Sequence, residues 1–290
     1  LLSPSKWLVS ELLKSPLTKG CHIEYLSNPL SQEFLKRDHK EKSIFEKIRV
    51  RIGFIAADLL SPYKGLEVLI KSIEMIAKSL KEQNKIELEL VLIGRGKIQI
   101  SSRMFEFTQH IVSNEQTLIQ KLEELDVLVV PSHQDNAPNV IVEALAVSLP
   151  VIGSSVGGIT EMIRKYGGTL FADNDHKQLA KILIEGCLNG FTRIKNDQIL
   201  YDFSPKKFTH DYSELTKRYF KKPNSIKFLI PKLSNYSLNN EWINTVLTSG
   251  GTDSFSNSII NLEINSENLN ICDSFSEISN ELALSIGGLT

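Results

Sequence analysis

Two acidic residues, Asp135 and Glu143, flank the start of an apolar segment in a pattern that suits ligand chemistry. They lie in the stretch 131–146, which directly follows the apolar run Val127–Val130. A strand is therefore expected to end, a polar loop to turn, and a helix to begin near Pro138. The free N–H groups at such a helix start form an anion site, and a diphosphate would fit there.

Glu143 is the unusual residue of this helix because its sequence neighbours on both sides are apolar. A helix of this kind is largely buried, and an unpaired carboxylate inside it is costly. Helical side chains tilt toward the N-terminus, so Glu143 is expected to lean toward the diphosphate end. There it could accept hydrogen bonds from two neighbouring hydroxyls, as on a ribose. An exposed edge position, or a bond from a backbone N–H, would explain Glu143 equally well.

Strands and helices alternate from about Val50 to about Leu188. The pattern predicts strands at 50–57, 86–93, 127–130, 151–152 and 170–171, and helices at 66–81, after Asn114, and at 138–147, 160–165 and 175–188. Ser3-Pro4 and Ser204-Pro205 each read as a helix cap followed by proline. The alternation predicts an α/β fold, a Rossmann-like, doubly wound parallel sheet covered on both faces. Ligands of such sheets bind at the carboxyl ends of the strands.

The stretch 131–161 resembles the signature of glycosyltransferase family 4, the Glu-x7-Glu element of enzymes with the GT-B fold. Asp135 and Glu143 stand at its two acidic positions. The resemblance covers roughly residues 1–220. Its other elements are the Gly157-Gly158 loop with Glu161, Lys64-Gly65, Gly94-Arg95-Gly96, Ser3–Trp7 as the last element of the family's N-terminal domain, and Ser27–Pro29 as the linker between domains.

This resemblance implies a retaining transfer of a sugar, of the hexosyltransferase type, from a nucleotide sugar to the hydroxyl of a sugar or lipid-linked acceptor. Polysaccharide or glycoconjugate biosynthesis would be its setting. Lys64 would neutralise the diphosphate leaving group, Asp135 would lie beside the transferred sugar, and Glu143 would bind the ribose. The resemblance implies no metal and no cofactor besides the donor. It assigns further donor contacts to Asn136, Asn139, Val140, Gly157, Gly158 and Arg95.

The chain departs from the family pattern in three respects. Asp135 is one methylene shorter than the usual Glu, and the Arg that often precedes the Lys-Gly element is absent, so one phosphate contact is either absent or supplied by Arg95. The acceptor-binding N-terminal domain is expected to be missing before Leu1. Expected domains are a remnant of the N-terminal domain with the linker at 1–45, the nucleotide-sugar-binding domain at 46–222, and a Ser- and Asn-rich extension at 223–290. The extension contains candidate strands at 226–230 and 259–264 and a candidate helix at 277–286. It is a separate small element, a truncated second domain or a partly disordered segment, and the sequence does not distinguish these.

Composition and charge restrict the classes of function and the cellular location that the sequence allows. The 290 residues carry a net charge of −1, so no basic excess predicts nucleic-acid binding. The apolar runs are too short to span a bilayer, and no signal peptide is visible. Three widely spaced cysteines suit a reducing compartment. We expect a cytoplasmic protein, with peripheral contact at the inner face of the membrane.

Two alternatives remain open from the sequence. The first is a non-catalytic module that binds a nucleotide sugar, favoured by Asp135, the absent Arg and the absent first domain. The second is another GT-B enzyme, such as a nucleotide-sugar epimerase or a phosphorylase, although no cofactor lysine site for a phosphorylase is visible.

Overall fold

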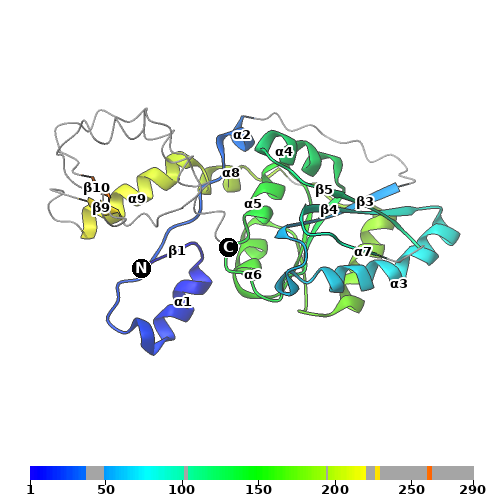
Figure 1. Ribbon diagram of the computed structural model, residues 1–290, viewed down its shortest axis with the longest axis horizontal. Coiled ribbons are helices and arrows are strands. Elements are labelled where there is room, and N and C mark those ends of the chain that lie inside the picture. The colour runs from blue at the N-terminus through cyan, green and yellow to red at the C-terminus, as the bar shows by residue number, and fades with distance from the viewer. Residues whose placement is uncertain (37–48, 101–103, 194, 220–225, 229–259, 263–290) are drawn as a thin grey trace. The chain divides into compact units, whose positions relative to one another are not determined.

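The computed structural model of the chain describes residues 1–36, 49–100, 104–193, 195–219, 226–228 and 260–262 (Figure 1). The chain divides into two compact units, Leu1–His210 and Asp211–Thr290. In the second unit, β9 (Ile226–Phe228) pairs antiparallel with β10 (Ile260–Leu262), within the two segments where the sequence predicts strands. The predicted helix at 277–286 and the charged segment at 38–47 lie outside the described residues. The domain boundaries expected at 45 and 222 stay predictions.

A six-stranded sheet forms the centre of the first unit, and every neighbouring pair of its strands is parallel. The strand order is β5-β4-β3-β6-β7-β8. The chain therefore runs outward from β3 to β5 and then returns to lay β6 on the other side of β3, so the order reverses between β3 and β6. The strands are β3 (Arg49–Asp58), β4 (Glu87–Arg95), β5 (Glu106–His110), β6 (Val127–Val130), β7 (Val151–Ser154) and β8 (Thr169–Phe171).

Helices cover both faces of this sheet, as the apolar runs of its strands require. On one face α3 and α7 pack with side chains such as Ile52, Leu90 and Val129. On the other face α4, α5 and α6 pack with the intervening residues, such as Val91 and Leu128. The helices are α3 (Leu66–Asn84), α4 (Glu115–Glu124), α5 (Asn139–Ala146), α6 (Gly157–Tyr166), α7 (His176–Asn189), α8 (Asp197–Asp202) and α9 (Pro205–Tyr219). The predicted doubly wound, Rossmann-like fold is confirmed.

The first 36 residues form a small β–α–β element. β1 (Leu2–Ser3) pairs parallel with β2 (Glu24–Tyr25), and α1 (Lys6–Lys14) and the 3₁₀ turn η1 (Pro16–Thr18) lie between them in the chain. A short helix, α2 (Gln32–Leu35), follows and buries Phe34.

The predicted cap of the first helix is wrong by two residues. Ser3 is extended rather than a cap because its carbonyl accepts the Leu26 N–H at 2.9 Å in the β1–β2 pair. The helix begins at Lys6, and Ser5 is its N-cap.

Among the elements that sequence periodicity misses are β5 and α8, and it also misplaces the start of α6. β5 is a polar edge strand without the apolar run that marks the others, and α8 has only six residues. α6 begins at Gly157, three residues before the predicted start at Thr160. Glycine is a poor helix former, so a reading by propensity excludes the first turn that packing creates.

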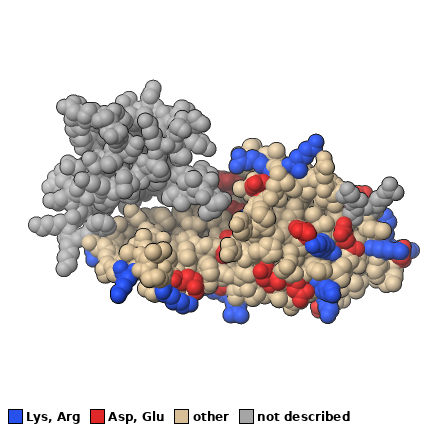
Figure 2. All heavy atoms as spheres, turned by 60° about the horizontal axis from the view of Figure 1, so that its bottom comes forward, with Lys and Arg blue, Asp and Glu red and all other residues tan. Residues whose placement is uncertain are grey.

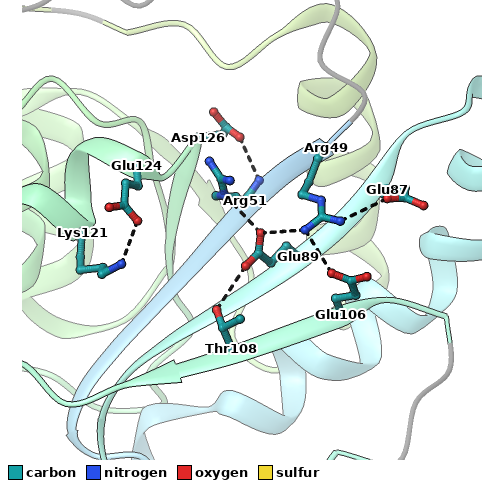
Figure 3. A network of polar contacts seen from close by, with 9 residues as sticks. All are labelled: Arg49, Arg51, Glu87, Glu89, Glu106, Thr108, Lys121, Glu124 and Asp126. Carbon is teal, nitrogen blue, oxygen red and sulfur yellow. Dashed lines mark hydrogen bonds and ion pairs between the residues drawn. The ribbon is translucent and has the colours of Figure 1, made fainter.

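Charged side chains gather at the amino-terminal ends of the three strands β3, β4 and β5 (Figure 3). The Arg51 Nε lies 3.1 Å from Oε2 of Glu89, and Arg49 lies within ion-pair distance of Glu87, Glu89 and Glu106. On the face drawn in Figure 2, basic and acidic side chains intermingle.

Candidate functional site

The loops that follow β3 and β6 meet at the point where the strand order reverses. Lys64 ends the 3₁₀ turn η2 (Pro62–Lys64) after β3, and Asp135 lies in the loop after β6. Lys64 Nζ is 2.9 Å from Asp135 Oδ2, with the lysine side chain 32% and the aspartate side chain 12% exposed. The two residues to which the resemblance assigns the chemistry are thus an ion pair at the carboxyl ends of the strands where their order reverses, the place where open α/β sheets bind ligands.

Backbone packing fixes the approach of these two loops. Gly65 has φ of 70°, and a Cβ built on it would lie 2.0 Å from the Pro131 carbonyl oxygen. The His133 N–H also donates to the Tyr63 carbonyl at 2.8 Å. Glycine is therefore required after Lys64, both for its left-handed conformation and for the close contact with the neighbouring loop.

The start of α5 follows β6 and the loop that carries Asp135. Pro138 is the N-cap and provides no side-chain cap bond. Within the described chain, the N–H groups of Asn139 and Val140 have no acceptor outside the helix. The Asn139 side chain accepts from Asn28 Nδ2 at 3.2 Å. An anion could therefore be bound by these two N–H groups, as expected for a helix start that follows a strand of such a sheet.

Glu143 lies one turn into α5 and is partly buried. Among the described residues its carboxylate has no hydrogen-bond or salt-bridge partner. Burial, and then the negative charge of Glu115, raise the pKa of Glu143 from 4.5 to about 7. Glu115 is the first residue of α4 and accepts a hydrogen bond from Ser31 Oγ. An unpaired, destabilised carboxylate of this kind can be stabilised by a ligand that donates hydroxyl protons to it.

The glycines Gly157 and Gly158 lie against the protein's own loop. A Cβ on Gly157 would be 2.3 Å from the Asp135 carbonyl oxygen, and one on Gly158 would be 1.5 Å from that of Asn136. The Gly158 N–H also donates to the Asp135 carbonyl at 3.0 Å. Close approach by backbone thus explains both glycines, and the first turn of α6 supports the loop that carries Asp135. Contact of these glycines with a ligand stays a prediction.

The start of α1 docks on the same loop and on α6. Glu161 accepts the N–H groups of Lys6, at 3.3 Å, and Trp7, at 2.8 Å. Ser5 Oγ donates to Asn136 Oδ1. The N-terminal donors of α1 are therefore already used inside the protein. The sequence analysis singles out Glu161 but does not predict that it binds the start of α1, and it does not single out Ser5. A serine directly before a helical pattern is the local feature that indicates Ser5 as a helix cap.

Two further candidates lie nearby without joining the central pair. Arg95 ends β4 and is exposed; its backbone carbonyl accepts the Leu59 N–H at 2.8 Å, and its side chain makes no hydrogen bond or ion pair with Lys64 or Asp135. His133 lies in the Asp135 loop, and its Nδ1 is 2.7 Å from Asp173 Oδ1 beyond β8. Asp173 is a second residue that sequence reasoning did not single out.

Within the described residues, no group of three or more His, Cys, Asp or Glu side chains is arranged to hold a metal ion.

In the same part of the chain, no helix combines the length and the apolar character needed to cross a membrane.

Comparison with known sequences supports a glycosyltransferase. Residues 49–187 match the family model described as glycosyl transferases group 1. A protein of Bacillus subtilis (strain 168), named for a glycosyltransferase of teichuronic acid biosynthesis, is 28% identical over 170 residues, which are 57% of this chain and 40% of the relative. An uncharacterized glycosyltransferase of Methanocaldococcus jannaschii is 30% identical over 179 residues, 57% of this chain and 48% of the relative. The matches thus span less than half the length of these relatives.

Solved structures share the fold at low sequence identity. A sucrose-phosphate synthase from Thermosynechococcus elongatus has a TM-score of 0.58 and 17% identity, covering 76% of this chain and 58% of that one. A glycosyltransferase from Rickettsia africae has a TM-score of 0.58 and 16% identity, covering 76% and 63%. The chain therefore has the α/β fold found in known glycosyltransferases.

Proposed function

We propose that this chain forms the donor-binding part of a glycosyltransferase that moves a sugar from a nucleotide sugar to an acceptor hydroxyl. One observation carries the proposal most directly: the Lys64–Asp135 ion pair at the switch point of the sheet, between β3 and β6. A cation for a diphosphate and a carboxylate for a sugar lie side by side there. The group 1 family match over the same domain supports it.

In the proposed reaction, the bond between the anomeric carbon and the diphosphate oxygen breaks, and the acceptor oxygen forms the new glycosidic bond. The nucleoside diphosphate leaves with both bonding electrons and takes up the proton that the acceptor hydroxyl loses. Lys64 stabilises the negative charge that develops on the leaving diphosphate. The N–H groups of Asn139 and Val140 at the start of α5 add two donors for the same phosphates. These roles follow the resemblance, as does retention at the anomeric carbon.

Glu143 serves the nucleoside in this proposal. Its ionised carboxylate accepts hydrogen bonds from the two ribose hydroxyls, which replace the protein partners that the structure does not supply. Asp135 accepts from a hydroxyl of the transferred sugar after Lys64 has moved toward the phosphate. Arg95, Gly157 and Gly158 complete the proposed donor contacts. The acceptor, its domain, and membrane contact are proposals that rest on the resemblance alone.

The test is calorimetry of the purified chain with UDP, GDP and representative nucleotide sugars, in buffer that contains a chelator. We expect saturable binding of at least one nucleotide without added metal. No detectable binding of any of them would overturn the proposal. Binding that appears only after Mg²⁺ is added would overturn the metal-independent form of it. Transfer to sugar acceptors, measured by release of nucleoside diphosphate, then separates an enzyme from a module that only binds.

A further inference from the structure

The backbone N–H groups of the first turn of α1 are all paired. The Ser5 hydroxyl oxygen accepts the Leu8 N–H at 3.1 Å, while the Glu161 carboxylate accepts those of Lys6 and Trp7. The Val9 N–H bonds to the Ser5 carbonyl at 3.2 Å. Ser5 itself is only 2% exposed. It is thus a buried hydroxyl with a defined acceptor role and one proton left to donate.

Ser5 Oγ donates this proton to Oδ1 of Asn136, a residue 131 positions further along the chain. A hydroxyl has one proton and two lone pairs; in this arrangement the Leu8 N–H occupies one lone pair, and the proton is directed at the oxygen of the Asn136 amide. The carbonyl end of the Asn136 amide faces Ser5, and its NH₂ group is turned away. Within the described chain, this NH₂ group has no hydrogen-bond partner. It carries two donors directly beside Asp135 in the sequence.

We infer that Ser5 is a positioning residue of the donor site: its hydroxyl orients the Asn136 amide so that the NH₂ group is offered to an acceptor oxygen of the nucleotide sugar. This inference rests on the proposed function. The loop would otherwise present a carboxylate, Asp135, next to an amide free to turn either end outward. With Ser5 in place, the side chains of Lys64 and Asn136 both supply donors, while Asp135 supplies the acceptor for a sugar hydroxyl.

A role of Ser5 only as helix cap predicts different behaviour of its variants. Ser5→Thr keeps both the cap and the hydroxyl proton. Ser5→Gly removes the hydroxyl but leaves a residue that is tolerated at N-caps at a cost of a few tenths of a kcal/mol, and Ser5→Ala removes both. Ser204 caps α9 through the Lys207 N–H at 3.1 Å, so Ser204→Ala is a matched loss of a serine cap away from the site.

The first experiment observes Asn136 without ligand, in the full chain labelled with ¹⁵N. Its side-chain NH₂ signals are assigned by their loss in Asn136→Asp. We expect Ser5→Gly and Ser5→Ala to shift these two signals and to speed their exchange with water, whereas Ser5→Thr and Ser204→Ala leave them in place. Unchanged signals in both Ser5→Gly and Ser5→Ala would overturn the inference, whether or not the chain binds a nucleotide sugar.

The second experiment measures donor affinity by calorimetry with the nucleotide sugar that the wild type binds. Loss of one oriented hydrogen bond should weaken binding about three- to tenfold in Ser5→Gly and Ser5→Ala. Ser5→Thr should restore wild-type affinity, and Ser204→Ala should match it despite a comparable loss in Tm. In Asn136→Asp, adding Ser5→Gly should produce no further loss. The inference is wrong if wild type and Ser5→Gly bind the donor with equal affinity. It is also wrong if the double variant shows a full additional loss of affinity. If the wild type itself does not bind, the proposed function is wrong instead.

Discussion

Lys64 Nζ and Asp135 Oδ2 lie 2.9 Å apart although 71 positions separate the residues in the chain. They are brought together because β3 and β6 are adjacent, and each residue follows one of these strands. The pair makes the unliganded site nearly neutral at its centre. A diphosphate must therefore compete with Asp135 for the lysine. Removing the charge of Asp135 should for this reason not lower the affinity for a nucleotide.

Neutralising Asp135 should separate binding from transfer. In Asp135→Asn the lysine loses its internal counter-ion, so affinity for UDP or GDP should stay unchanged or rise a few-fold, while transfer falls by roughly 100-fold or more. In Lys64→Met, affinity should fall roughly tenfold to a hundredfold, since a charged hydrogen bond contributes about 1.5–3 kcal/mol. Calorimetry and release of nucleoside diphosphate measure the two effects. A large loss of nucleotide affinity in Asp135→Asn would contradict the competition between aspartate and phosphate.

Donor binding should depend on pH through Glu143. Its carboxyl must be ionised to accept from two hydroxyls, and its pKa is raised to about 7. Affinity should therefore fall as pH drops below about 7 and level off above it. Glu143→Gln should bind roughly tenfold to a hundredfold more weakly at pH 8 and lose this pH dependence. Glu115→Gln removes the neighbouring charge, so it should move the midpoint to lower pH. A pH profile identical in wild type and Glu143→Gln would refute the assignment.

The same group has a second, opposite effect on stability. Because the pKa of Glu143 is higher in the folded chain than its ordinary 4.5, the folded state binds more protons between pH 4.5 and about 7. This contribution to stability is full below pH 4.5 and is lost as pH rises through about 7. Glu143→Gln should therefore raise the free energy of unfolding at pH 8, by at most about 3 kcal/mol and by less in proportion to the solvent around the partly exposed carboxylate. Urea unfolding at pH 5 and pH 8 checks it, and a lower stability of the variant at pH 8 would show that Glu143 has a structural partner.

Gly158→Ala should disturb the loop that carries Asp135. The added Cβ would lie 1.5 Å from the Asn136 carbonyl oxygen, so the loop or the first turn of α6 must move. We expect a loss of stability of about 2 kcal/mol or more, together with weaker donor binding. Gly167→Ala is the control: a Cβ there meets nothing within 4 Å, and only its φ of 101° is unfavourable. Equal donor affinity of the two variants would argue against α6 as the support of the loop.

Removing residues 223–290 should leave nucleotide affinity within a few-fold of the full chain. The contacts described for the candidate site come from residues 5–173 in the first unit, and the sequence after Lys222 carries no motif of the family. Circular dichroism should first show that the shortened chain keeps its helices. A tenfold or greater loss of affinity in a folded, shortened chain would assign the extension a part in donor binding.

The sequence predicts the central sheet well because its strands are buried runs and its helices are amphipathic. It also places Lys64 and Asp135 in loops that follow predicted strands, whereas the adjacency of those two strands, β3 and β6, is known only from the structure. β5 escapes because an edge strand needs only one apolar side, as Phe107 and its polar neighbours illustrate. The sequence analysis does not predict the roles of three further residues, Ser5, Glu115 and Asp173, for another reason. Each has its role through a contact with a residue more than 25 positions away, and a local sequence pattern does not indicate such contacts.

The charged residues at the amino-terminal ends of β3 and β4 favour one pairing register of these two strands. Both faces of these strands are buried, so hydrophobic alternation alone distinguishes poorly between registers. Arg49 stands opposite Glu87, and Arg51 opposite Glu89, with Thr108 of β5 donating to Glu89 at 3.3 Å. A slip of one residue would set Arg51 beside Leu88 or Leu90 and leave Glu89 without its arginines. These ion pairs thus favour one register of the strands. That register sets where the loops at the opposite ends of the strands begin.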